Sequence, residues 1–339
     1  MKKLLYVAHF YKGSTAYERL DDLKYNFEVE ILNIYPFFPV WKRSFSTIWR
    51  KLSFGPPFFN LYKALLSSLD NYPFEIVFIE KNLYINLSNL NYLKNKYGVK
   101  LVMFNQDSLK VKDNISRILI KSLPIFDKVI STKKYDLNLY KKYGVSNIYF
   151  VKDAISKKTI ERNVISENIS SNFKYDIGFI GRWEIGREKL IRRLALELNF
   201  NFVLSGPGWL NRKNVFSNNV DILNSVWGDD YINLIKSIKI NLGLLSEKAE
   251  DELTTRIIEI PIYNGFMLTN YNPETLNIFS KNKAEEILFK NYDELFNKVY
   301  FFIRNNKERN NLLKRTKKCI FINKLTWKDQ LNNLVLYTK

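Results

Sequence analysis

Short apolar runs alternate with amphipathic stretches along the first half of the chain. The runs predict buried strands at Lys3–Phe10, Glu28–Ile34, Phe74–Ile79, Lys100–Phe104, Asp127–Ser131 and Val145–Val151. Between them, apolar residues at helical spacing predict helices at Ala16–Lys24 and Leu87–Tyr97. Buried strands separated by amphipathic helices are typical of parallel βαβ units.

The same alternation begins again after a polar segment, Ser156–Asn172, which is the best linker in the chain. Strands are expected at Tyr175–Ile180, Phe200–Leu204, Lys239–Leu244 and Phe266–Leu268, and helices at Arg187–Leu198, Tyr231–Ser237, Thr254–Tyr263, Asp293–Asn305 and Leu325–Tyr337. Asn291, three residues before Glu294, is the expected N-cap of one of these helices.

Two α/β halves predict two Rossmann-like domains, residues 1–155 and 173–322, followed by a C-terminal helix in 323–339 that packs back on the first domain. Ligands of such sheets bind at the carboxyl ends of the strands. With two domains facing each other, the cleft between them is the expected site.

The composition is that of a globular protein without disulfides. The 339 residues include 25 Phe, 21 Tyr and 6 Trp, which exclude disorder as the main state. A single cysteine, Cys319, excludes an intrachain disulfide and a cysteine-based zinc site, and a single histidine, His9, excludes an HExxH site. No metal is expected. The start of the chain is expected to be a buried strand and not a signal peptide, and no run reaches the ~20 apolar residues that span a bilayer, so a cytoplasmic location is expected.

The net charge of +19 favours anionic partners. Nucleic acid is not expected, because the lysines are scattered and no zinc finger or RNA-recognition motif is present. Phosphates and an anionic membrane surface are the favoured partners. The aromatic segment Tyr35–Phe59 interleaves Trp41 and Trp49 with basic residues, which suits docking on the inner leaflet, whereas packing in the core or a plain loop stays an open alternative.

Two glycine-rich turns and one loop are candidate anion sites. Gly13-Ser14-Thr15 leads into a helix N-terminus and offers backbone N–H groups, although neither a GxGxxG nor a P-loop motif is present. The segment GFIGRWEIGR carries four candidate residues, and SGPGW follows a later strand. In these segments Arg182 and Arg187 can clamp a pyrophosphate, and Trp183 either stacks on a base or packs in the core. The residues singled out are Gly181, Arg182, Trp183, Arg187, Gly206 and Trp209.

The stretch Asp251–Thr269 is the most informative one. Glu259 stands in an apolar run, three residues after Arg256, so the two side chains share a helix face. A buried carboxylate needs a partner, and either a ribose diol or Arg256 can supply one. Both readings stay open.

The motifs RWEIGR, SGPGW and TTRIIEIPIYNGFMLTNYNPETLNIF resemble the glycosyltransferase group related to spore maturation protein CgeB, in the GT-B superfamily. Looser likeness extends to Gly13-Ser14, to Lys81 after FEIVFIE, and to Asp107 in FNQD. The resemblance implies an α/β GT-B-like fold and a metal-independent glycosyltransferase without cofactors, in which the C-terminal domain binds a nucleotide-sugar. The N-terminal domain binds a glycan, lipid-linked or protein acceptor, as in cell-surface polysaccharide synthesis.

The resemblance also implies roles for individual residues. Donor contacts are implied for Asp251, Thr255, Arg256, Glu259, Asn264 and Gly265, and acceptor or phosphate contacts for Gly13, Ser14 and Lys81. Asp251 lies in the E-x7-E register, and Glu252 lies one residue off it. Retention of configuration is slightly favoured; an inverting enzyme needs a base, for which His9 and Asp107 are the candidates. An epimerase or hydrolase on the same fold, and a non-catalytic polyanion-binding protein, are the alternatives.

Overall fold

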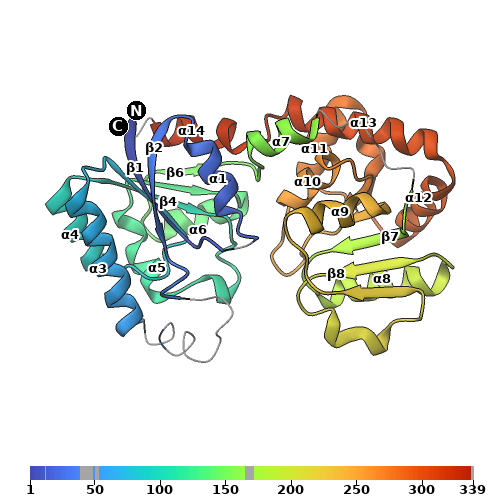
Figure 1. Cartoon of the computed structure of the whole chain (residues 1–339), viewed down its shortest axis with the longest axis horizontal. Coiled ribbons are helices and arrows are strands. Elements are labelled where there is room, and N and C mark those ends of the chain that lie inside the picture. Colours follow the sequence, from blue (N-terminus) through green and yellow to red (C-terminus); the bar gives the residue numbers. More distant parts are fainter. Residues whose placement is uncertain (12, 39–48, 50–52, 165–171, 337–339) are drawn as a thin grey trace. The chain divides into compact units, whose positions relative to one another are not determined.

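The computed structural model describes residues 1–11, 13–38, 49, 53–164 and 172–336. The chain divides into two compact units. Unit 1 is Met1–Lys157 with Thr326–Lys339, and unit 2 is Lys158–Leu325. Each holds one parallel six-stranded sheet, which confirms the predicted α/β class (Figure 1). Trp41 and the basic residues of the predicted membrane segment lie outside the described residues.

Unit 1 has the strand order β2-β1-β3-β4-β5-β6, with every neighbouring pair parallel. Its strands are β1 (Lys2–Ala8), β2 (Phe27–Asn33), β3 (Ile76–Glu80), β4 (Lys100–Asn105), β5 (Lys128–Ser131) and β6 (Ile148–Phe150). Its helices are α1 (Ala16–Leu23), α3 (Pro56–Asn71), α4 (Leu87–Tyr97), α5 (Arg117–Ser122), α6 (Leu137–Lys142) and α14 (Trp327–Leu336). The order reverses between β1 and β3, so the carboxyl ends of these strands form the switch point at which α/β sheets bind ligands.

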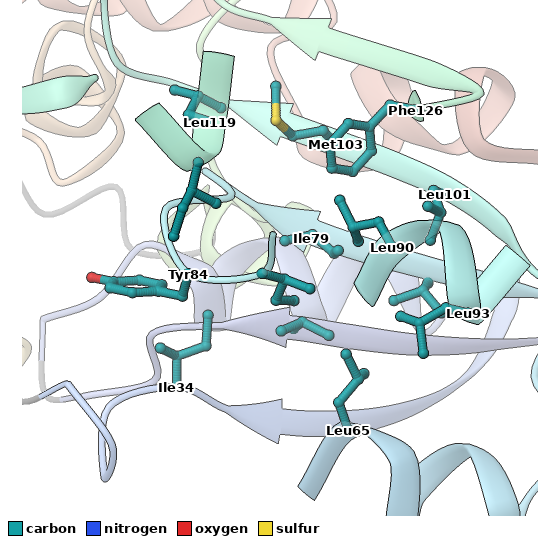
Figure 2. Close-up of a cluster of buried hydrophobic side chains, with 14 of the residues drawn as sticks. Ile34, Leu65, Ile79, Tyr84, Leu90, Leu93, Leu101, Met103, Leu119 and Phe126 are labelled. Carbon is teal, nitrogen blue, oxygen red and sulfur yellow. The ribbon is translucent and has the colours of Figure 1, made fainter. Parts of the chain in front are cut away.

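The side chains of β1 alternate between two cores, as the period of a strand requires. Leu5 and Val7 join the cluster under α3, α4 and α5, where Leu65, Leu90 and Leu119 meet strand residues such as Met103 (Figure 2). Tyr6 and its neighbours on the other face pack under α1, together with Trp327 of α14. Helices therefore cover both faces of the sheet, so a ligand can bind only at the ends of its strands or along its two outer strands.

Helix α1 holds the C-terminal helix in place. The Asp22 carboxylate accepts hydrogen bonds from the backbone N–H groups of Lys157 (2.9 Å) and Lys328 (2.6 Å). The Arg19 guanidinium lies over the rings of Phe104 and Trp327, 4.8 Å and 5.1 Å from their centroids. The two chain segments that leave and re-enter unit 1 are thus fixed to one helix, with α14 beside α1 (Figure 1).

Unit 2 has the strand order β12-β11-β10-β7-β8-β9, again with all pairs parallel. Its strands are β7 (Tyr175–Ile180), β8 (Phe202–Ser205), β9 (Val220–Leu223), β10 (Ile238–Gly243), β11 (Met267–Asn270) and β12 (Leu288–Phe289). Its helices are α7 (Lys157–Val164), α8 (Ile185–Glu197), α9 (Asp229–Ser237), α10 (Thr255–Ile262), α11 (Pro273–Phe279), α12 (Tyr292–Arg304) and α13 (Asn306–Ile322). The switch point here lies between β7 and β10.

Several local predictions can be compared with the structure directly. Asn291 caps α12 by accepting a hydrogen bond from the Glu294 N–H at 2.9 Å, as predicted. Helix α7 forms within the predicted linker, and the division between the two units falls between Lys157 and Lys158, near the start of that segment. No helix in the described part of the chain is long and apolar enough to cross a membrane.

Candidate functional site

Two arginines meet at the switch point of the second sheet. Arg187 of α8 and Arg256 of α10 each donate a hydrogen bond to the carbonyl oxygen of Leu244, the residue after β10, both at 3.1 Å. Both guanidiniums also lie over the Phe179 ring, 5.3 Å and 5.1 Å from its centroid. Like charges that share one acceptor repel each other. The arrangement therefore favours an anion.

Arg187 is buried, with 7% of its surface exposed. It donates to the carbonyl oxygen of Arg182 at 2.9 Å and pairs with Glu184 at 3.0 Å. Its Nε–H is buried without a hydrogen-bond partner among the described residues. Burial, followed by the charge of Arg256, lowers the pKa of Arg187 to about 10. The group stays charged at pH 7, and an oxyanion can satisfy the remaining donor.

Glycines let the backbone approach these arginines closely. A Cβ on Gly181, the residue after β7, would lie 2.5 Å from Arg256 Nη2. Gly206, after β8, has φ of 135°, and a Cβ there would lie 2.2 Å from the Gly181 oxygen. Trp209 is fully buried and donates its indole N–H to that same oxygen at 2.8 Å. Trp209 thus fixes the Gly181 turn from inside the protein. It has no exposed surface for a ligand, which disagrees with the donor contact predicted for it.

The N-terminus of α10 lies at the same edge of the sheet. Its N-cap residue, Thr254, has a buried hydroxyl without a hydrogen-bond partner among the described residues. Thr255 and Arg256 form the first turn, and helix N-termini favour anions. Asp251, which precedes the helix, is half-buried, and its N–H donates to the Ser246 carbonyl oxygen at 3.0 Å.

Glu259 accepts a hydrogen bond from the Tyr231 hydroxyl at 2.9 Å. Burial, followed by the charge of Glu259, raises the pKa of Tyr231 well above its usual value, so the phenol stays a donor. The i, i+3 neighbour Arg256 extends to the Leu244 carbonyl. Tyr231, which lies 28 residues earlier in the chain, was not among the predicted site residues.

Neighbouring side chains fix the Trp183 ring, and Arg182 does not join the predicted clamp. The Trp183 indole N–H donates to Glu188 at 2.5 Å, and Arg212, which pairs with Glu188 at 2.7 Å, lies over the ring at 5.6 Å. The Arg182 side chain is exposed, and its carbonyl is what Arg187 contacts. The pair of guanidiniums that the structure brings together is Arg187 with Arg256, not Arg187 with Arg182.

Asn264 and Gly265 lie at the opposite edge of the sheet. Helix α10 runs back along the strands, so its C-terminal end reaches the amino end of β11. Asn264 adopts the left-handed conformation with φ of 65° and accepts a hydrogen bond from Lys317 Nζ at 2.6 Å. A Cβ on Gly265 would lie 2.5 Å from Ile235. Both residues shape the turn into β11, and the donor contact predicted for them is corrected accordingly.

In unit 1, His9 follows β1 at the switch point. Its Nε2 lies 3.2 Å from the Tyr84 hydroxyl, and its Nδ1 is buried. Ser14 ties the next turn to it, because its hydroxyl donates to the His9 carbonyl oxygen at 2.6 Å and accepts from the Ala16 N–H at 3.2 Å. Gly13 turns the chain with φ of 87°.

Asp107 and Lys81 follow β4 and β3, and they form an ion pair at 2.5 Å. Lys81 Nζ also donates to the Asn114 side-chain oxygen at 3.0 Å. The Asp107 side chain is 49% exposed, so of the two predicted bases it is the accessible one. Lys81 itself has φ of 45°, a left-handed conformation that is rare for a residue with a side chain.

A buried network that was not predicted lies beside them. Arg19 pairs with Glu80 through two hydrogen bonds of 2.5 Å and 2.9 Å, and Tyr6 donates to the same carboxylate. Gln106 links Arg19, at 3.2 Å, to the buried Asp153, at 2.6 Å. Helical and strand periodicity offered no signal for this network, because its members come from five separate segments.

Comparisons with known proteins agree with this geometry. The family model described as "Glycosyl transferase-like" matches residues 187–335. No curated protein matches the sequence. Among solved structures, sucrose-phosphate synthase from Thermosynechococcus elongatus is 11% identical with a TM-score of 0.66, covering 99% of this chain and 98% of that one. An alpha-glucosyltransferase in complex with UDP and a 13-mer DNA containing a HMU base is 10% identical with a TM-score of 0.71, covering 100% and 99%.

A glycosyltransferase involved in avilamycin A biosynthesis is also similar, with 12% identity and a TM-score of 0.54, covering 96% of this chain and 95% of that one. These likenesses establish the GT-B fold. The matched segment, residues 187–335, is glycosyltransferase-like, in agreement with the motifs in that part of the sequence.

Proposed function

We propose that unit 2 binds the diphosphate of a nucleotide-sugar between Arg187, Arg256 and the N-terminus of α10. The observation that carries this proposal is the pair of guanidiniums on the Leu244 carbonyl oxygen at the switch point. Glu259, held by Tyr231, faces the ribose diol, for which a carboxylate is the matching acceptor. Thr255 of α10, Asp251 before that helix, and the indole of Trp183 are further donor contacts in this proposal.

Unit 1 binds the acceptor, a glycan, lipid-linked or protein hydroxyl, beside Asp107. In the transfer, the bond between the sugar C1 and the diphosphate oxygen breaks and the acceptor oxygen bonds to C1. With retention, the acceptor proton passes to the leaving diphosphate, and Asp107 positions the hydroxyl; with inversion, Asp107 is the base. Two arginines and a helix N-terminus neutralise the leaving charge, so the reaction is proposed to need no metal.

A CgeB-like subgroup and a role in cell-surface polysaccharide synthesis at the inner leaflet complete the proposal. The motif Glu259-Ile260-Pro261 and the charge of +19 support them. In the described part of the aromatic segment, Phe54 and Phe59 are 62% and 56% exposed and pack edge to face. Apolar rings beside basic residues suit the headgroup region of a membrane.

A thermal-shift screen with UDP, GDP, CMP and TDP tests the donor site. A nucleotide at 100 times its Kd adds about 2.7 kcal/mol, so one of the four should raise the Tm by several degrees. Arg187→Lys keeps the charge but loses the planar guanidinium, whose two terminal nitrogens contact two carbonyl oxygens. It should therefore abolish most of the rise in Tm with nucleotide. The matched control is Arg193→Lys on the exposed face of α8, which should keep the shift. The proposal fails if no nucleotide raises the Tm, or if Arg187→Lys responds like the control.

A further inference from the structure

Lysines gather in the loops at the carboxyl edge of the first sheet. One follows β3, two follow β4, two follow β5 and one follows β6. They are Lys81, Lys110, Lys112, Lys133, Lys134 and Lys152. The strands are parallel, so these loops lie along one edge. The described loops of this edge hold these six lysines against four aspartates, whereas the loops at the amino edge hold one lysine, Lys24, against Glu75 and Asp127.

Two of the four aspartates point into the protein. Asp136 is fully buried and accepts a hydrogen bond from the Leu109 N–H at 2.7 Å. Asp153 is 2% exposed and accepts one from Gln106 at 2.6 Å. Lys110, Lys112 and Lys134, in contrast, are exposed. The two buried carboxylates hold the loops together, and the outward-facing charge comes from these three lysines, because Lys133 is only 6% exposed.

Lys81 is held in one position at this edge. Its left-handed φ of 45° costs free energy, and its ammonium group is fixed by Asp107 at 2.5 Å and by Asn114 at 3.0 Å. Strained backbone of this kind is concentrated at ligand clamps, where the surrounding structure enforces it. The strain at Lys81 and the lysine-rich loops are independent observations about the same edge.

The carboxyl edge of the second sheet has no such excess of lysine. Its loops carry five basic residues, Arg182, Arg212, Lys213, Lys248 and Lys290, against five carboxylates, Glu184, Glu247, Glu250, Asp251 and Glu252. In the proposed function, the donor diphosphate is met there by the two helical arginines. The basic loops belong to the unit that, in the proposed function, binds the acceptor.

We infer that the acceptor carries phosphate and that the lysine-rich edge of unit 1 recognises it; this inference rests on the proposed function. Lysine binds phosphate as a point charge and does not require the planar geometry of a guanidinium. The four strands β3 to β6 span only about 15 Å at the usual spacing between strands, which suits one or two phosphate groups. Duplex DNA binding commonly uses six to ten phosphate contacts. A phosphorylated sugar, free or linked to a lipid, is the ligand that fits.

Calorimetry with full-length protein, saturated with the nucleotide that the screen identifies, tests this inference, because that nucleotide then occupies the donor site. Glucose 6-phosphate should bind at least about tenfold more tightly than glucose. Lys112→Ala/Lys134→Ala should remove this preference. Lys141→Ala/Lys142→Ala removes the same charge from the far end of α6, at the amino edge, and should keep it. The affinity for that nucleotide should be the same in all three proteins.

The outcomes separate the two proposals. If none of the four nucleotides binds the wild type, the donor site is wrong. If one of them binds but glucose 6-phosphate binds no better than glucose and vesicles of phosphatidic acid bind no better than those of phosphatidylcholine, the acceptor inference is wrong. If the protein prefers the phosphatidic acid vesicles to glucose 6-phosphate, and only Lys112→Ala/Lys134→Ala loses this preference, the phosphate belongs to a lipid. Equal losses in both double variants, or tighter binding of a duplex DNA than of either probe, would overturn the inference.

Discussion

Arg256→Gln is the substitution that best separates a ligand site from a structural contact. The guanidiniums of Arg187 and Arg256 each lie 3.1 Å from one oxygen, so their nearest nitrogens are within about 6 Å of each other. At that separation two unit charges repel by about 1 kcal/mol in water and about 3 kcal/mol at an effective dielectric constant of 20. Removing Arg256 relieves this repulsion and loses a hydrogen bond and a ring contact worth about 1–2 kcal/mol. The free energy of unfolding without ligand should therefore fall by no more than about 1 kcal/mol.

The effect on nucleotide binding should be much larger. A hydrogen bond from a charged donor to phosphate contributes about 1.5–3 kcal/mol, and each 1.4 kcal/mol is a factor of ten in Kd. The variant should thus bind the nucleotide found in the screen about 10- to 100-fold more weakly. A contact that served only stability would give the opposite pattern, with lower stability and unchanged affinity.

Urea unfolding without nucleotide and calorimetry with it measure the two quantities. Arg193→Gln is the control, because Arg193 pairs with Glu197 on the exposed face of α8 at 2.9 Å. It should leave the Kd unchanged. A loss of more than about 2 kcal/mol of stability in Arg256→Gln, or a Kd within threefold of the wild type, would refute the assignment of this pair to a phosphate.

Three further outcomes follow from the same geometry. Tyr231→Phe should weaken nucleotide binding about three- to tenfold in calorimetry, because it removes the hydrogen bond that orients Glu259; an unchanged Kd would leave Tyr231 a packing residue. Trp209→Phe should cost about 1–3 kcal/mol in urea unfolding, because the buried Gly181 carbonyl loses its donor; a cost below about 0.5 kcal/mol would contradict this. Sugar transfer should continue in excess EDTA, since arginines supply the positive charge; loss of activity that Mg²⁺ restores would show that a metal takes part.

Most strands could be predicted from the sequence because each is a short apolar run buried on both faces. The prediction at Tyr175–Ile180 agrees with β7, and that at Leu87–Tyr97 with α4. Helix α3, Pro56–Asn71, was missed. Its core positions Phe58, Leu61 and Leu65 have helical spacing, but the aromatic cluster before them was interpreted as a membrane segment.

The candidate site was harder to predict, because its central atom belongs to the backbone. Arg187 and Arg256 are 69 residues apart, and they meet on the carbonyl oxygen of Leu244, which no side-chain pattern marks. The sequence named Arg182, Arg187 and Arg256 as candidate diphosphate contacts, but it paired Arg187 with Arg182 as the clamp because the two are close along the chain. Asn264 and Gly265 belong to a recognisable motif, but a two-turn helix carries them to the far edge of the sheet.

The two carboxyl edges hold positive charge in different ways, and burial explains the difference. Arg187 is buried, fixed by two carbonyls and Glu184, so salt screens its attraction to a phosphate only weakly. The exposed Lys112 and Lys134 act mainly through a field that 0.15 M salt screens within about 8 Å. A diphosphate offers the same geometry in every nucleoside diphosphate sugar, which rigid arginines can match, whereas flexible lysines tolerate phosphates at varied positions. The net charge of +19 therefore does not describe one anion site; it combines a buried pair suited to the donor and an exposed edge suited to the acceptor.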